Sequence, residues 1–72
     1  MNAFGEMTHN EVLRVKLEVL RREHRDLDDA IHALEASARA DHLTVRRLKK
    51  QKLSLKERIT RIEDDLLPDI IA

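Results

Sequence analysis

Apolar residues recur along most of this chain at alternating spacings of three and four positions. The first run begins at Leu13, the second ends at Leu66, and neither is interrupted by glycine or proline. This is the spacing of the a and d positions of a helical heptad, which share one face of an α-helix and pack against a second helix. The pattern predicts an all-α protein with two helices, over about residues 9–37 and 42–67.

The start of each helix carries a capping signal, but the segment between the helices carries no clear turn signal. Thr8 followed by Glu11 fits a capping box, in which the threonine hydroxyl accepts a hydrogen bond from the backbone N–H three residues later. Asp41 is suited to cap the second helix. However, residues 37–42 contain no glycine or proline, and the heptad runs through them, so one straight helix of about 58 residues is also allowed.

Charge favours an antiparallel arrangement of the two helices. A parallel dimer would oppose Lys16 with Arg21 across its interface, whereas folding the chain about residues 39–40 opposes acids with bases. The same fold places Leu20 opposite Ile59. The expected attractive pairs are Arg14–Glu63, Lys16–Asp65, Glu23–Arg58, Asp28–Lys49 and Glu35–His42, and the one repulsive pair is Arg21–Lys56. A hairpin and a swapped dimer of two straight helices make the same pairs, so both remain open.

Composition supports helices that associate. The chain has 72 residues, of which 39% are charged and 1% aromatic, which is typical of long exposed helices. We expect one domain over 1–72, with short tails at 1–8 and 68–72. A chain this short buries little core, which favours self-association. Net charge is zero and cysteine is absent, so there is no thiolate site. No signal peptide or membrane span is apparent, and we expect a cytoplasmic protein.

Two segments resemble a known family. The segment with Glu23-His24, Leu27-Asp28 and Leu34-Glu35 is similar to the first-helix motif of the YdcH-like family of small bacterial proteins. Leu48-Lys49-Lys50-Gln51-Lys52-Leu53-Ser54-Leu55-Lys56-Glu57-Arg58-Ile59 is similar to the second-helix motif, with Glu57 where the family usually has Asp. The resemblance covers about residues 13–62. It implies a helical hairpin and a family of uncharacterised function, although the proline or glycine often found at the turn is missing here.

Catalytic and metal chemistry have little support. His24, Asp28 and His32 are spaced four residues apart and so lie on one side of the first helix, where they resemble a zinc-ligand set. Lys49 and Lys52 are expected opposite them, and their positive charge would repel a cation. The chain has no glycine-rich phosphate loop and no plausible nucleophile–base pair. We therefore expect neither an enzyme nor a metal or other cofactor.

Two features off the ordinary heptad pattern indicate protein contacts. His24 and Lys52 occupy positions of the apolar seam, where polar residues fix register and oligomeric state. A second apolar stripe lies outside the seam, on the outer side of the first helix, and a stripe at helical spacing indicates a helix–helix interface. The residues predicted for interaction are Val12, Val15, Val19, His24, Lys52 and Leu53.

The sequence therefore predicts a small non-enzymatic interaction module, an adaptor or regulator, that binds itself or another protein's helix. The alternative is a weak nucleic-acid-binding protein, because eight basic residues and one acid lie between Arg46 and Arg61. The candidate residues for that alternative are Arg46, Arg47, Lys49, Lys50, Lys56, Arg58 and Arg61.

Overall fold

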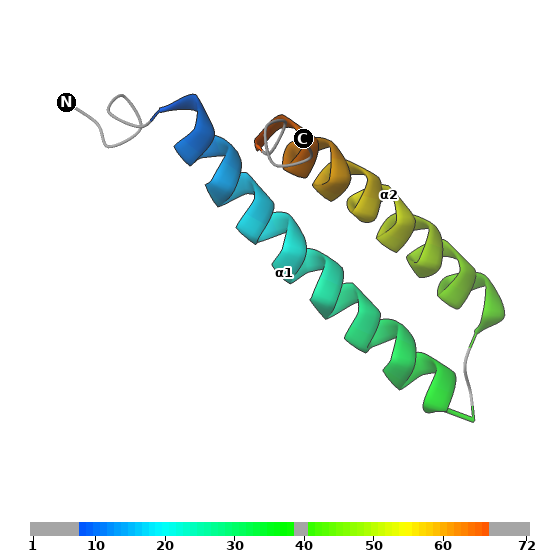
Figure 1. The fold of residues 1–72 in the computed structure, drawn as a ribbon. Helices are drawn as coiled ribbons and strands as arrows, with labels where there is room; N and C mark the ends of the chain where they lie inside the picture. The colour runs from blue at the N-terminus through cyan, green and yellow to red at the C-terminus, as the bar shows by residue number, and fades with distance from the viewer. Residues whose placement is uncertain (1–7, 39–40, 67–72) are drawn as a thin grey trace.

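Two antiparallel α-helices lie side by side and form the fold (Figure 1). The computed structural model describes residues 8–38 and 41–66, in which α1 spans His9–Ala36 and α2 spans His42–Leu66. The prediction of an all-α antiparallel hairpin is confirmed, and the straight single helix is wrong. Apart from Thr8, the predicted tails at 1–8 and 68–72 lie outside the described residues, as does the predicted end of the second helix at residue 67.

The start of α1 is set by Thr8. Its backbone is extended, and its hydroxyl oxygen accepts a hydrogen bond from the Glu11 N–H at 3.1 Å. The first N–H groups of a helix have no partner within the helix, so a side-chain oxygen at this position satisfies one of them. The predicted cap at Thr8 is therefore confirmed.

The chain reverses direction through two ordinary capping residues. Ser37 leaves the helical conformation for an extended one, and its N–H bonds the Leu34 carbonyl at 3.1 Å. Asp41 then caps α2, because its carboxylate accepts from the Leu43 N–H at 3.0 Å and from the Thr44 hydroxyl at 2.8 Å. Both bonds lower the pKa of Asp41, that from Thr44 most. No described residue has a positive φ, and residues 37–42 contain no glycine.

The densest packing lies near the end of the hairpin that carries the chain termini. Leu17, Leu20 and Ile59 are buried together there, and Leu55, Ile62 and Leu66 pack against them. Sequence analysis placed Leu20 opposite Ile59, and the cluster confirms this register. Ile31 and Val45 are buried closer to the turn. The six buried apolar residues are Leu13, Leu17, Leu20, Ile31, Val45 and Ile59.

The middle of the hairpin has no fully covered side chain. From residue 21 to residue 30 of α1, and from residue 46 to residue 58 of α2, no residue is buried. The seam positions there are His24, Leu27, Leu48, Lys52 and Leu55, and each of them is half-buried. The polar residues in the seam thus coincide with a gap between the two buried regions.

Ion pairs between the helices differ from those expected. Arg21 bonds Glu63 at 2.8 Å, where Arg14–Glu63 was predicted. Lys49 bonds Glu35 at 3.0 Å, where pairs of Asp28 with Lys49 and of Glu35 with His42 were predicted. Glu63 and Glu35 each lie seven residues, or about two helical turns, beyond the positions predicted to face Arg21 and Lys49, which are Lys56 and Asp28. Because Arg21 reaches Glu63, it also has an acidic partner in place of the repulsive Lys56.

Candidate protein-interaction groove

The two flanks of the helix–helix seam differ in character. The ion-paired residues Arg21 and Asp28 directly follow the seam leucines, Leu20 and Leu27, along α1. Residues that directly precede a seam residue, such as Ala30 before Ile31, lie on the opposite flank of an α-helix. In residues 8–38 and 41–66, every ion pair between the helices involves a residue on the flank of Arg21 and Asp28, which we call the first flank.

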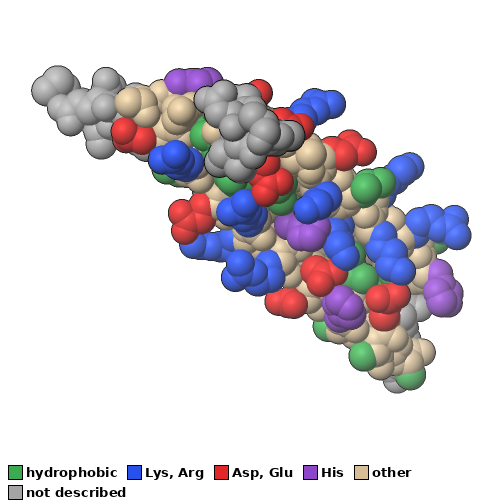
Figure 2. All heavy atoms as spheres, in the orientation of Figure 1, with side chains coloured by type: hydrophobic (Ala, Val, Ile, Leu, Met, Phe, Trp, Pro, Cys, Tyr) green, Lys and Arg blue, Asp and Glu red, His purple; other side chains and the backbone are tan. Residues whose placement is uncertain are grey.

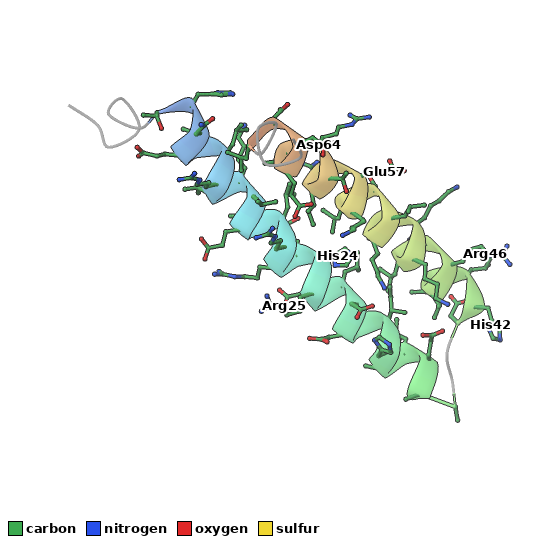
Figure 3. All side chains as sticks on the ribbon, in the orientation of Figure 1. His24, Arg25, His42, Arg46, Glu57 and Asp64 are labelled. Atoms are coloured by element: carbon green, nitrogen blue, oxygen red, sulfur yellow. The ribbon has the colours of Figure 1, made fainter. Side chains whose placement is uncertain are left out.

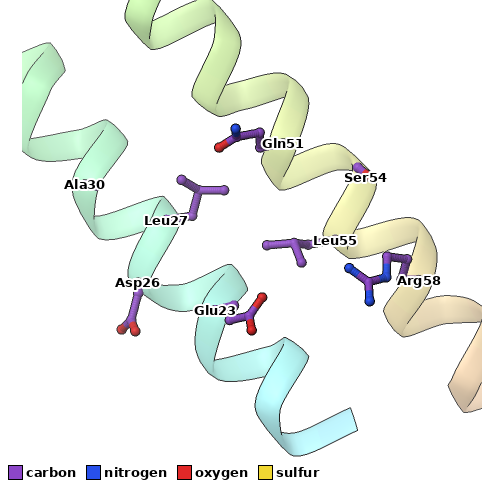
Figure 4. A pocket seen from close by; sticks show the side chains of 8 residues that line it. All are labelled: Glu23, Asp26, Leu27, Ala30, Gln51, Ser54, Leu55 and Arg58. Carbon is purple, nitrogen blue, oxygen red and sulfur yellow. The ribbon is translucent and has the colours of Figure 1, made fainter. Parts of the chain in front are cut away.

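On the second flank a groove of about 570 Å³ runs between α1 and α2. Figure 4 shows Leu27 of α1 and Leu55 of α2 pointing toward one another across it. Both leucines are half-buried, so the groove has an apolar floor that is open to solvent. Three of its lining residues, Ala30, Gln51 and Ser54, are short or neutral, whereas the other flank carries ion pairs. The lining residues are Glu23, Asp26, Leu27, Ala30, Gln51, Ser54, Leu55 and Arg58.

A second hollow, of about 430 Å³, continues the groove toward the end that carries the termini. The two hollows share Glu23 and Arg58, so they form one elongated depression along the hairpin. Val19 lines the second hollow, and 48% of its surface is exposed. Val15 is similarly exposed, whereas Val12 is half-buried. Of the predicted valine stripe, Val19 is therefore the member that belongs to the groove.

The rims of the groove carry opposite charges. Glu23 and Asp26 stand on the α1 rim of the first hollow, and Arg58 and Arg61 stand on the α2 rim. Lys16 adds one basic residue to the α1 rim of the second hollow. The predicted pair of Glu23 with Arg58 is not formed, since none of the ion pairs in the described part of the chain involves either residue. Figure 4 shows the Glu23 and Arg58 side chains on the two sides of the groove.

The predicted Lys16–Asp65 pair is also absent among the described residues. Both positions flank the seam on the groove side, where the rims stand apart. The two ion pairs predicted for this flank, Lys16–Asp65 and Glu23–Arg58, are therefore not formed.

Polar seam residues lie on the ion-paired flank. Lys52 Nζ donates to Asp28 Oδ1 at 2.5 Å, and this hydrogen bond is the main cause that lowers the pKa of Asp28. His32 Nδ1 donates to the Asp28 backbone carbonyl at 2.8 Å. His24 projects from α1 toward α2 (Figure 3). Among the described residues, no three histidine or acidic side chains are placed to hold a metal ion.

Basic residues of α2 are spread over different sides of the helix. Arg58 and Arg61 line the groove, and Lys49 is bound to Glu35. Figure 3 shows Arg46 projecting from the side of α2 that faces away from α1. On the face drawn in Figure 2, basic and acidic side chains are interspersed. Of the residues proposed for nucleic acid, Arg46, Arg47, Lys49 and Lys50 line one hollow together, whereas Arg58 and Arg61 line the groove.

A shallow hollow on the outer side of α2 holds the most exposed leucines. Leu43 is 74% exposed and Leu53 is 59% exposed. Around them stand Arg46, Arg47 and Lys50. Leu53 was predicted to take part in protein contacts, and the structure places it on this outer surface, away from the groove.

Sequence reasoning missed the groove floor and the Lys52–Asp28 bond. Leu27 and Leu55 were assigned to a continuous seam, and Asp28 was paired with Lys49. A signal was available in Ala30 and Gln51, which face one another in the predicted register at positions where neighbouring heptads carry charges. Small or neutral side chains there leave the seam uncovered on that flank.

Comparisons with known proteins place this chain in a family. A family model described as "Protein of unknown function (DUF465)" matches residues 17–63. This match confirms the resemblance to the YdcH-like proteins, which the family contains. No curated protein and no solved structure matches the chain. Neither described helix is long and apolar enough to cross a membrane.

Proposed function

This chain belongs to the DUF465 family, and we propose that it is a non-enzymatic helical protein–protein interaction module that acts as an adaptor or regulator. The observation that carries the proposal is the groove in which Leu27 and Leu55 remain half-exposed. Apolar surface in an elongated depression between helices suits the apolar face of another helix. A cytoplasmic location remains the prediction made from the sequence.

The dimensions of the hairpin support a binding role for this side. Its smallest extent is 15 Å, which is little more than the diameter of one helix with its side chains. Domains ordinarily pack two layers of secondary structure around a shared core. A hairpin is a single layer, so a partner helix in the groove would supply the second layer and cover both leucines.

The chemistry of the groove supports binding more than catalysis. Ser54 is the hydroxyl-bearing residue of the first hollow, and no histidine lines that hollow to act as its base. Glu23 and Arg58 carry opposite charges at the two rims, which suits recognition of a charged partner surface.

A photo-crosslinking residue placed in the native cell tests the proposal. We expect Ser54, in the groove, to give crosslinked protein species, whereas Thr60, exposed on α2 and absent from the groove, should give few. Mass spectrometry then identifies what is joined to Ser54. Equal yields from the two positions, or none from Ser54, would show that this side binds no protein.

A further inference from the structure

The occupant of the groove must match an apolar floor between rims of opposite charge. From Leu13 to Ala30, the two hollows span 18 residues of α1, which corresponds to about 26 Å at a rise of 1.5 Å per residue. That length fits several turns of a helix lying along the hairpin. Ala30 and Ser54 are small, so a helix backbone can approach the floor closely.

The rims define the charge that a partner must carry. Against Glu23 and Asp26, on the α1 rim of the first hollow, a partner should present bases. Against the basic α2 rim, with Arg58 and Arg61, it should present acids. The hairpin itself carries one rim of each kind on this flank, so it has the surface that its own groove requires.

We propose that the groove is filled by a second copy of this chain, related by a two-fold axis parallel to the helices. This rotation sets α1 of one copy beside α2 of the other, antiparallel and at matching heights. Glu23 then faces Arg58 of the partner subunit, twice in the dimer. The product is an antiparallel four-helix bundle in which Leu27 and Leu55 of both copies are enclosed. The inference rests on the proposed function, because it names the partner of the same groove.

Charge selects this axis over the alternative one. A two-fold axis perpendicular to the helices, also in the plane of the interface, would set α1 beside α1 and α2 beside α2. With that axis at the first hollow, Glu23 and Asp26 of the two copies would meet each other, as would the two Arg58 side chains, and like charges disfavour that arrangement. Two-fold contacts are self-complementary, so one favourable pairing is repeated by symmetry.

The available area is sufficient for a stable dimer. A helix of 25 residues is about 37 Å long, and two helices, each about 10 Å wide, present a face of about 750 Å². Two such faces bury about 1,500 Å² in total, which lies within the 1,200–2,000 Å² typical of specific interfaces. A second copy of the same chain thereby supplies the second layer of helices that a single hairpin lacks.

Sedimentation of matched variants tests whether the groove is the interface. Wild type should be a dimer at micromolar concentration, and Ser54→Glu should raise the dissociation constant at least tenfold, because it places a charge over the apolar floor. Thr60→Glu introduces the same charge on an exposed part of α2 and should leave dimerisation unchanged. Circular dichroism verifies that both variants remain helical. A monomeric wild type at several hundred micromolar, or equal effects of the two substitutions, would overturn the inference.

Single cysteines determine the axis, because the native chain has none. Mixing Asp26→Cys chains with Ser54→Cys chains should give a mixed disulfide between the copies. Mixing Asp26→Cys with Lys56→Cys, on the other flank, should not. Self-linked Asp26→Cys dimers in place of the mixed species would indicate the perpendicular axis and refute this dimer. The proposed function would still stand in that case, and it fails if Ser54 captures no protein in the cell or captures no more than Thr60 does.

Discussion

Replacing Leu20 by alanine tests the packing of the hairpin most directly. Leu20 is 6% exposed and lies in the cluster with Leu17 and Ile59. The substitution removes three carbons, which at about 0.8 kcal/mol each corresponds to about 2.4 kcal/mol of lost burial. A residual cavity would add to this, but a single layer lets neighbouring side chains collapse, so we expect the lower part of the range of about 2–5 kcal/mol.

The expected loss is large relative to the total stability. At about 0.05–0.15 kcal/mol per residue, 72 residues give an unfolding free energy of about 4–11 kcal/mol. A loss of about 2–3 kcal/mol should lower Tm by roughly 10–20 °C. Urea titration followed by far-ultraviolet circular dichroism measures it, at several protein concentrations because association adds to apparent stability.

Leu53→Ala is the matched control for this prediction. The side chain of Leu53 is 59% exposed on the outer face of α2, so its truncation should change the unfolding free energy by less than about 0.5 kcal/mol. If both variants lose the same stability, the assignment of Leu20 to the core and of Leu53 to the surface is refuted.

Three further predictions concern the cap, the central pair and the basic residues. Thr8→Ala should cost about 1 kcal/mol of unfolding free energy, whereas Thr8→Ser should cost little because it keeps the hydroxyl; urea titration of both compares them. The pKa of Asp28 is lowered in the folded state by Lys52, so its contribution to stability is present above the unfolded pKa of about 3.9 and is lost as pH falls below it. Asp28→Asn should therefore flatten the loss of stability below about pH 4, and an unchanged acid profile would contradict this. Duplex DNA should bind weakly, with a log–log salt slope of about −0.9 per phosphate contact. Submicromolar anisotropy binding at physiological salt, abolished by Arg46→Glu with Lys50→Glu, would instead establish nucleic-acid recognition.

The helices and their register could be predicted because both depend on residue type and spacing. Alternating three- and four-residue intervals fix which side of each helix is apolar, and the observed cluster of Leu20 with Ile59 follows from them. The choice between a hairpin and a straight helix could not be made. Residues 37–42 contain neither glycine nor proline, and the reversal depends on how Ser37 and Asp41 satisfy backbone groups.

The ion pairs beside the candidate site could not be predicted correctly, because long side chains reach past the residue directly opposite. Opposing charges by heptad position assumes that each side chain meets the residue directly across, whereas Arg21 extends along α2 to Glu63. The groove was missed for a related reason. A heptad pattern states which residues face the neighbouring helix, but it does not state whether the flanks close over them, and Leu27 and Leu55 are covered on one flank only.

The middle of the hairpin, where no side chain is buried, is the part that should open locally at the lowest free-energy cost. Two buried regions, one around Leu20 and one near Ile31, anchor the ends, while residues 21–30 and 46–58 between them have no buried side chain. Local opening costs least where little apolar contact is lost. Backbone amides of these central turns should therefore exchange with solvent faster than those beside the anchors. We therefore expect that, if an incoming helix separates α1 from α2, the separation begins in these central turns and not at the two buried ends.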